Sequence, residues 1–501
     1  MEIKIKEIII YNMKNFFCIT FLGLFIFPVF SQQTVEKLLE GYFKNSLEIH
    51  NLSAEMDEEI IQAEKTLLQT GLSIKVSTGT IQITAGDETE ISLSPNASLQ
   101  IPQADNLSFS AKSNIEIEDG DADFKNTNFS VSADIISSGM EKRRITLDES
   151  NRAVLVAQRN LQNGFVSVES EFYKSIKNLY QTIVNISNAK KDLYEDQLSF
   201  NQIKAQGYST SSTKYRLAEM EVISDQHKVE VYEHELEREA KIFASKCGIE
   251  WNFKNVKEFL PKEIPQVQPI KISSFNKEDY LETENANWKS EINERKRQAD
   301  KDLTLSVNAG YTINNEVHND EYKNTIDAGT ALTWNGTGLT ANAGVSVPTN
   351  SDPLIYTFGL SVDPNEFKLR KLSKKIDDIE RSKEKIAINS SKSNYVTSVI
   401  SQNTTLHDLE WAKKKDLENL DLYTKLEEDT KTYFDRGLIT ESEYNSAKVN
   451  KENYQVQCLI DDIEMIIYNN DTKLLFTRDS ELYKDKENVN GDEKNEDKQK
   501  D

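Results

Sequence analysis

The feature that most constrains the fold is a charged, amphipathic stretch from Asn365 to Arg436 that contains neither proline nor glycine. As a single helix, its roughly 70 residues would rise about 100 Å at 1.5 Å per residue. Gly437 ends the stretch, and residues 446–476 then follow a second helical pattern. Glycine supplies the backbone freedom that a turn between helices requires. The sequence therefore predicts a very long antiparallel helical hairpin with its tip near Gly437.

The residues after Gly437 carry a helix-start signature. Thr440 is followed three residues later by Glu443, which is the spacing of a capping box. We therefore expect Thr440 to be the N-cap of the second helix of the hairpin.

A similar interruption occurs at Gly207, 230 residues before Gly437. The stretch 72–79 matches 303–310 at nearly the same offset, and 129–134 matches 358–363. Landmarks repeated at one offset indicate a tandem duplication. Each half is then expected to contain a helix, a set of strands and a helical hairpin, with tips near Gly207 and Gly437.

Two regions, 72–136 and 303–363, change to an alternating pattern that predicts β-strands. Leu303, Leu305 and Val307 alternate with small polar residues, and Asn335-Gly336 is a hairpin signal. Strands with one apolar face fit either a half-buried soluble sheet or a transmembrane barrel. The duplication, the long helices and an apolar export signal at the N-terminus favour the barrel.

The N-terminus has the pattern of an export signal. A basic segment at Met13-Lys14 precedes an apolar run from Phe16 to Phe30 and then Ser31, as in a signal peptide. Met13 is the better start codon. No later segment has the long apolar run of a membrane-spanning helix. We therefore expect an exported chain without a transmembrane helix.

These patterns divide the chain into five segments. The first half begins with a helical pattern from Thr34 to about Gln69, and the linker contains Pro261, Pro265 and Pro269. The predicted segments are a signal peptide at 1–31, a first repeat at 32–258, a linker at 259–275, a second repeat at 276–476 and a disordered charged tail at 477–501.

Composition excludes several functions. The net charge of −23 argues against a nucleic-acid partner. His234-Glu235 begins like a zinc-binding helix, but Arg238 stands where the second histidine is needed. We predict no enzyme activity, no metal and no cofactor. Cys247 and Cys458 could form a disulfide or be buried as small hydrophobic residues.

This organisation resembles the TolC-like outer-membrane efflux proteins (outer membrane factors) over most of the mature chain. The family signature at the hairpin tip, F/Y-x-x-G-L-x-S/T, is matched by Phe434, Gly437, Leu438 and Thr440. Tyr444 and Ala447 match the positions that follow. The Gly207 turn matches more loosely, through Ser209 or Thr210 and Ala218.

The resemblance implies an α+β membrane protein: a trimeric outer-membrane β-barrel continued by a long α-helical periplasmic barrel, built from two tandem structural repeats. It implies an exit duct of a tripartite efflux pump or type I secretion system that passively conducts substrates to the exterior. Its partners would be two further copies, a periplasmic adaptor, an inner-membrane transporter and outer-membrane lipid. The alternative is a non-conducting periplasmic or surface coiled-coil structural protein, or an adhesin.

The resemblance also implies functional residues. Glu443 falls at an acidic position that constricts the periplasmic aperture in the family, and Glu441 lies nearby. Glu443 is also interpretable as a favourable charge at a helix start, and the two roles are compatible. One departure concerns the sheet, because each half offers about four alternating segments where the family has two. The additional segments could be extracellular hairpins or barrel strands. The adaptor-docking residues implied at the hairpin tips are Gly207, Tyr208, Ser209, Gly437, Leu438 and Thr440.

Overall fold

The structure is a computed structural model that describes residues 34–477, except 86–88, 105, 119–120, 301–302, 317–320, 335–336 and 351. The predicted signal peptide, the Asn335-Gly336 turn and all but the first residue of the predicted tail lie outside the described residues. The chain divides into two compact units. One comprises Met1–Asn45, Ser175–Gln266 and Leu417–Ile463, and the other comprises Ser46–Lys174, Val267–Asp416 and Glu464–Asp501.

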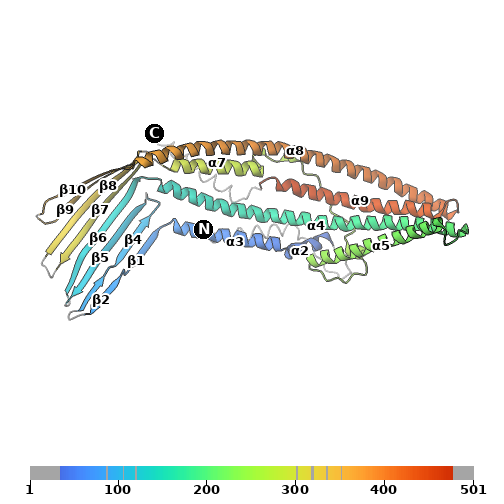
Figure 1. Cartoon of the computed structure of the whole chain (residues 1–501), viewed down its shortest axis with the longest axis horizontal. Helices are drawn as coiled ribbons and strands as arrows, with labels where there is room; N and C mark the ends of the chain where they lie inside the picture. Colours follow the sequence, from blue (N-terminus) through green and yellow to red (C-terminus); the bar gives the residue numbers. More distant parts are fainter. Residues whose placement is uncertain are drawn as a thin grey trace, which may run out of the picture. The chain divides into compact units, whose positions relative to one another are not determined.

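An antiparallel sheet of ten strands forms one end of the second unit (Figure 1). Its main path has the order β1-β4-β5-β6-β7-β8-β9-β10, and the β2–β3 hairpin joins it where β3 pairs with β5. The sheet is open within the chain. The strands are β1 (Ser73–Ser77), β2 (Ile81–Ala85), β3 (Thr89–Leu93), β4 (Asn96–Ile101), β5 (Leu107–Glu118), β6 (Asp121–Ile136), β7 (Leu303–Glu316), β8 (Glu321–Trp334), β9 (Leu339–Pro348) and β10 (Ile355–Val362).

The helical part of this unit consists of α3 (Leu47–Gln69), α7 (Leu281–Ala299), the first part of α4 (Gly139–Ala205), most of α8 (Pro364–Asp435) and the end of α9 (Glu441–Leu474). Small apolar clusters pack it. One contains Ile145, Ile292 and Ala299 with Trp288 against them. Another contains Ile272, Tyr280 and Phe476. Among the described helices, none is long and apolar enough to cross a membrane.

The first unit contains α2 (Val35–Lys44), α5 (Thr213–Lys246) and the short α6 (Val256–Phe259). It also contains the parts of α4, α8 and α9 that lie nearest the Gly207 and Gly437 turns. Burial raises the pKa of the Cys247 thiol to about 12, and no disulfide joins the two described cysteines, Cys247 and Cys458. Cys247 is therefore a buried small side chain, the second of the two alternatives considered. In the same unit the Phe243 ring lies 6.1 Å from that of Tyr42 and 6.0 Å from that of Phe259, measured between ring centroids.

Two helix boundaries differ from the sequence prediction. The predicted helix from Thr34 to Gln69 is wrong as a single element, because it breaks at Asn45-Ser46. The Ser46 side chain accepts a hydrogen bond from the Ile49 amide at 3.4 Å and starts α3 anew. The second repeat is predicted to begin at residue 276 with a helix, but this helix, α7, begins only at Leu281, after a 3₁₀ turn at Lys277–Asp279.

Candidate functional site

The strand register sorts the side chains of the sheet into two contrasting faces. Side chains alternate between faces along each strand, and cross-strand partners share a face. Following cross-strand partners from β1 to β10 gives a row of residues on one face. One such row is almost wholly apolar: Ile74, Leu99, Phe109, Val131, Ala309, Ala328, Val345 and Tyr356. The adjacent row is Lys75, Ser98, Ser110, Ser130, Gly310, Asp327 and Ser346, and it ends in Ile355 at the start of β10.

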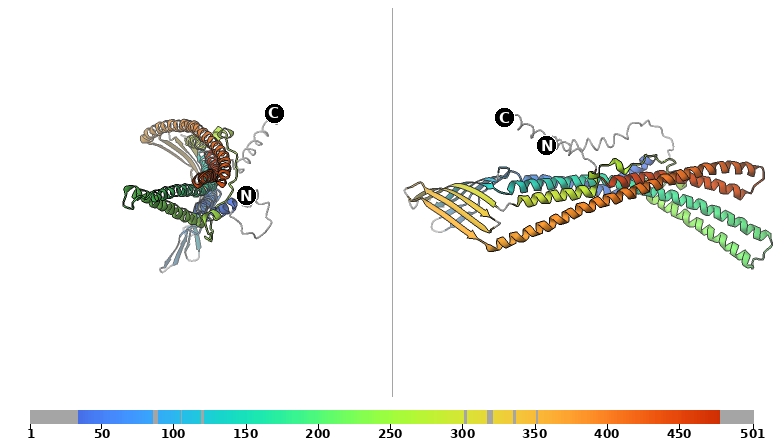
Figure 2. Two further views of the ribbon diagram at one scale, coloured as in Figure 1. Left: turned by 90° about the vertical axis from the view of Figure 1, so that its right-hand side faces the viewer. Right: turned by 90° about the horizontal axis from the view of Figure 1, so that it is seen from above.

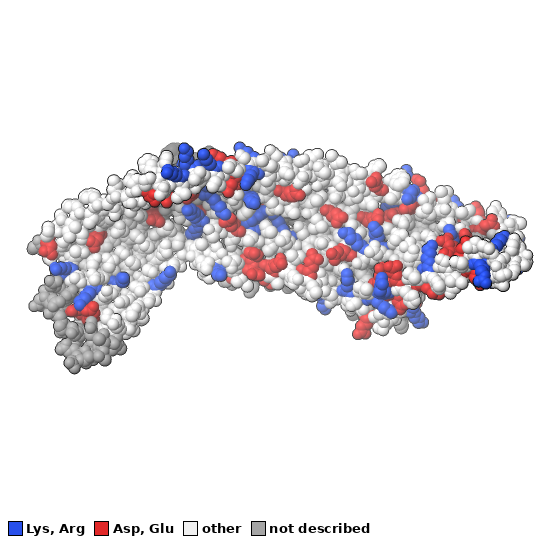
Figure 3. Space-filling model, in the orientation of Figure 1, with Lys and Arg blue, Asp and Glu red and all other residues white. Residues whose placement is uncertain are grey.

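The apolar face is exposed across the sheet. The exposed fraction is 79% for Val76, 50% for Phe129 and 82% for Phe358. Figure 3 shows that charged side chains of both signs are frequent along the helices. A monomeric soluble protein rarely leaves so large an apolar surface in water.

The height of the apolar face fits a bilayer. Apolar residues occupy alternate positions of β7 from Leu303 to Ile313. These ten steps span about 33 Å of strand, or about 25 Å once the strand is tilted by about 40°. An apolar band of about 25 Å is typical of outer-membrane barrels.

The opposite face is held together by short polar side chains. The hydroxyls of Ser108 and Ser132 lie 2.7 Å apart, and Asn128 donates to Thr312 at 2.8 Å. Ser346 donates to the Asp327 carboxylate at 2.6 Å. Small hydroxyl and amide groups of this kind suit a wall in contact with water.

The Gly437 turn is closed by its own backbone. Gly437 has φ +68°. Its amide donates to the Phe434 carbonyl at 2.8 Å, and the Leu438 amide donates to the Tyr433 carbonyl at 2.9 Å. This pair of bonds is a Schellman motif, which requires a left-handed residue at the glycine position. The turn leaves Leu438 66% exposed at its tip.

The signature residues on either side of the turn contact each other. The rings of Phe434 in α8 and Tyr444 in α9 stack with centroids 5.5 Å apart. The Tyr444 hydroxyl donates to Glu427 at 3.3 Å. These contacts join the two helices just behind the turn, so the exposed backbone of the turn is held in one conformation.

The predicted capping box is confirmed. The Glu443 amide donates to the Thr440 hydroxyl at 3.3 Å, and the Thr440 amide donates to the Glu443 carboxylate at 2.8 Å. The hydrogen bonds that the Thr440 amide and hydroxyl donate to the carboxylate lower the pKa of Glu443. Glu441 lies beside Tyr194 of α4, where burial and then the Glu441 carboxylate raise the pKa of the phenol.

We predict that the Glu443 cap makes stability depend on pH. Because its folded-state pKa is depressed, its contribution is present above the ordinary value of 4.5 and is lost as pH falls through the folded value. The unfolding temperature of Glu443→Gln should therefore lie below that of the native protein at pH 7, and the difference should shrink below pH 4.5. Thermal unfolding of both proteins across this range measures it, and a constant difference would contradict it.

The Gly207 turn is more polar. Gly207 has φ +71°, and Tyr208 is exposed beside it. The Ser209 and Ser211 hydroxyls lie 2.9 Å apart, and Lys214 Nζ lies 4.6 Å from the Tyr208 ring centroid. Figure 2 shows each turn at the end of its hairpin. In the described residues, no hydrogen bond, ion pair or ring contact links the two turns.

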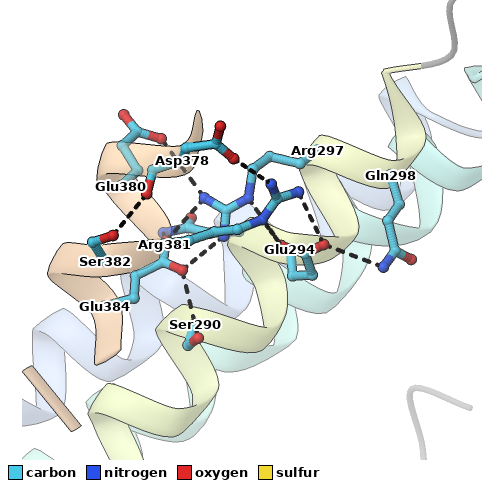
Figure 4. Close-up of polar contacts among 10 residues, drawn as sticks. Ser290, Glu294, Arg297, Gln298, Asp378, Glu380, Arg381, Ser382 and Glu384 are labelled. Atoms are coloured by element: carbon cyan, nitrogen blue, oxygen red, sulfur yellow. Dashed lines mark hydrogen bonds and ion pairs between the residues drawn. The ribbon is translucent and has the colours of Figure 1, made fainter. Parts of the chain in front are cut away.

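Sequence reasoning missed a network of ion pairs around α7 (Figure 4). Arg297 contacts Glu384 of α8 at 2.7 Å, and Arg381 of α8 contacts Glu294 of α7 at 2.9 Å. Hydrogen bonds from Arg381 and Arg297 lower the pKa of Glu294 to about 2. On the other side of α7, Arg295 contacts Glu141 and Asp148 of α4 at 2.9 Å and 2.8 Å.

We predict that Arg297 is a main anchor of α7. Its side chain is only 8% exposed, so Arg297→Ala leaves the Glu384 carboxylate partly buried without its main partner and should cost about 1–3 kcal/mol of unfolding free energy. The matched control is Lys296→Ala, because the exposed Lys296–Glu149 pair is of a kind worth about 0–1 kcal/mol. Chemical denaturation of the two variants compares them, and equal losses would contradict the prediction.

Comparison with known proteins places the chain in a family. Residues 38–265 match the TP096X N-terminal domain, and residues 265–479 match the TP096X C-terminal domain. The two domain matches meet at residue 265 and together span most of the chain. The chain therefore belongs to the TP096X family. No curated protein matches it.

The solved structures that it resembles include several outer-membrane proteins. The outer-membrane channel OprN matches with a TM-score of 0.48 and 11% identity, over 87% of this chain and 89% of that one. VceC from Vibrio cholerae matches with a TM-score of 0.44 and 10% identity, over 88% and 94%. The Campylobacter jejuni CmeC channel matches with a TM-score of 0.45 and 13% identity, over 90% and 88%.

Proposed function

We propose that the protein is an outer-membrane exit duct of a tripartite efflux pump or type I secretion system, through which substrates pass passively to the exterior. The observation that carries the proposal is the two-faced sheet. Its apolar face has the height of a membrane and is exposed, and its small polar face suits a water-filled lumen.

Because the sheet is open within one chain, further copies of the chain are needed to close it into a barrel. Every backbone polar group must be paired inside a bilayer, so an open sheet cannot remain in lipid. In the proposed trimer, strands of three copies close one barrel, and the long helices form the periplasmic tube. The two tandem repeats supply each copy with two hairpins.

We assign the hairpin turns to the periplasmic adaptor. Gly207, Tyr208 and Ser209 form one docking turn, and Gly437, Leu438 and Thr440 form the other. Exposure of Tyr208 and Leu438 supports this assignment. Three copies of Glu441 and Glu443 at the α9 start would make the entrance acidic and would favour cations.

The first test is the state of the purified protein. A duct must be extracted from the outer-membrane fraction with detergent and must have the mass of three chains, measured by light scattering with correction for detergent. A coiled-coil spacer or an adhesin without a pore would be recovered without detergent, and that result would overturn the proposal.

A further inference from the structure

The sheet contains more strands than a duct with four strands per copy needs, and its pairing shows where they belong. β4 pairs with the Leu107–Lys112 part of β5, and β3 pairs with the Ile115–Ile117 part. Both lie on the edge of β5 opposite β6. In the same way β1 pairs with β4 and β2 pairs with β3. β1–β2 and β3–β4 are thus two interrupted strands, so the path across the sheet crosses eight strands.

The interruptions are bridged by backbone hydrogen bonds. The Ser94 amide donates to the Thr80 carbonyl at 3.1 Å, and the Ser113 amide donates to the Pro95 carbonyl at 3.0 Å. Gly79, with φ +66°, lies in the interruption between β1 and β2. The extra segments are therefore continuous with the apolar wall rather than a separate hairpin folded away from it.

The two edges of this sheet are complementary. Strands alternate in direction along the eight-strand path, so β1 and β10 run in opposite directions. β10 of one copy can therefore pair antiparallel with β1 of the next. Ile74 and Val76 of β1 lie on the apolar face with Tyr356, Phe358 and Leu360 of β10. Both edges present largely exposed apolar side chains, which is typical of edges that pair with another chain.

We propose that each copy contributes all eight strands, with β10 pairing to β1 of the next copy, so that the trimer closes a barrel of 24 strands. This inference rests on the proposed function for the number of copies. With strands about 4.8 Å apart and tilted by about 40°, such a barrel has a backbone diameter of about 48 Å, against about 24 Å for 12 strands.

The width has a consequence for cargo. Small residues such as Ser130, Gly310 and Ser346 line the polar face, so side chains narrow the lumen by only about 10 Å. A lumen of about 38 Å would admit a polypeptide with secondary structure, whereas that of a 12-stranded barrel would not. The outer mouth of this duct therefore suits macromolecular cargo as well as small solutes.

Cysteine cross-linking tests which strand is the neighbour of β10. The starting protein has its native cysteines replaced by alanine. Val76→Cys is then combined in turn with Tyr356→Cys, Phe358→Cys and Leu360→Cys, because the inter-copy register has to be scanned. The control combines Phe109→Cys, on the same apolar face of the central strand β5, with Phe358→Cys.

The expected result is an oxidant-dependent ladder of covalent dimers and trimers for at least one Val76 combination and none for the Phe109 control. The reverse pattern, with β5 cross-linked to β10, would overturn the inference and show a narrower barrel. So would a detergent-extracted trimer in which no combination cross-links. The mass of the unoxidised protein is measured first, so that absence of the trimer counts against the proposed function and not against the strand number alone.

Discussion

Phe129→Arg should abolish assembly of the protein in the outer membrane. Phe129 lies on the apolar face of β6, directly opposite Ala111 of β5 and Tyr311 of β7, and its side chain is 50% exposed. A lipid-facing arginine costs about 2–4 kcal/mol at the middle of a bilayer and about 1 kcal/mol toward the interfaces, and Phe129 pairs with Tyr311, toward one end of the Leu303–Ile313 apolar band. In the trimer this cost would be incurred three times, so assembled protein should fall to a small fraction of the native amount.

Ser130→Arg is the matched control. Ser130 is the next residue in β6, faces the polar side and pairs with Ser110 and Gly310. An arginine there would extend into a water-filled lumen, so assembly should be close to normal. Detergent-extracted trimer from the outer-membrane fraction is quantified for both variants. Equal loss in both, or normal assembly of Phe129→Arg, would contradict the orientation of the sheet.

The second large effect is expected at the Gly437 turn. Gly437→Val should abolish export while leaving the assembled trimer intact. Valine in the left-handed region costs more than the roughly 1–2 kcal/mol of an ordinary residue, because it is β-branched. A Cβ at this position would meet no atom within 4 Å, so the damage is confined to the turn backbone and to what docks on it.

Gly437→Asn tests which property of residue 437 matters for docking: its left-handed backbone conformation or its lack of a side chain. Asparagine tolerates the left-handed region far better than valine. If the shape of the turn is what the partner binds, Gly437→Asn should retain most export. Export of a pump substrate is measured beside the amount of trimer. Loss of the trimer in both variants would count against docking as the role of this residue.

The turn and its cap were predictable because they depend on local interactions. Thr440 and Glu443 are three residues apart, and Gly437 alone supplies the left-handed residue that the Schellman motif needs. The break at Asn45-Ser46 was missed, because a serine N-cap inside an amphipathic pattern does not by itself end a helix.

The contacts that were not predictable are long-range. Arg297 and Glu384 are 87 residues apart, and both halves of the chain are so rich in charge that no pair is distinguished by sequence. The number of strands in the sheet also depends on contacts between distant parts of the sequence, such as the pairing of Phe129 with Tyr311. Alternation identified the strands as apolar on one side but could not say whether the additional segments enter the main sheet.

Planar-bilayer conductance of the purified, detergent-extracted oligomer tests the duct most directly, with Glu443→Ala measured beside it. We expect a small, cation-preferring conductance that rises in the variant, because the substitution removes acidic groups from the entrance and releases the start of α9. No conductance from a trimer shown to be inserted in the bilayer would contradict an open path through the protein.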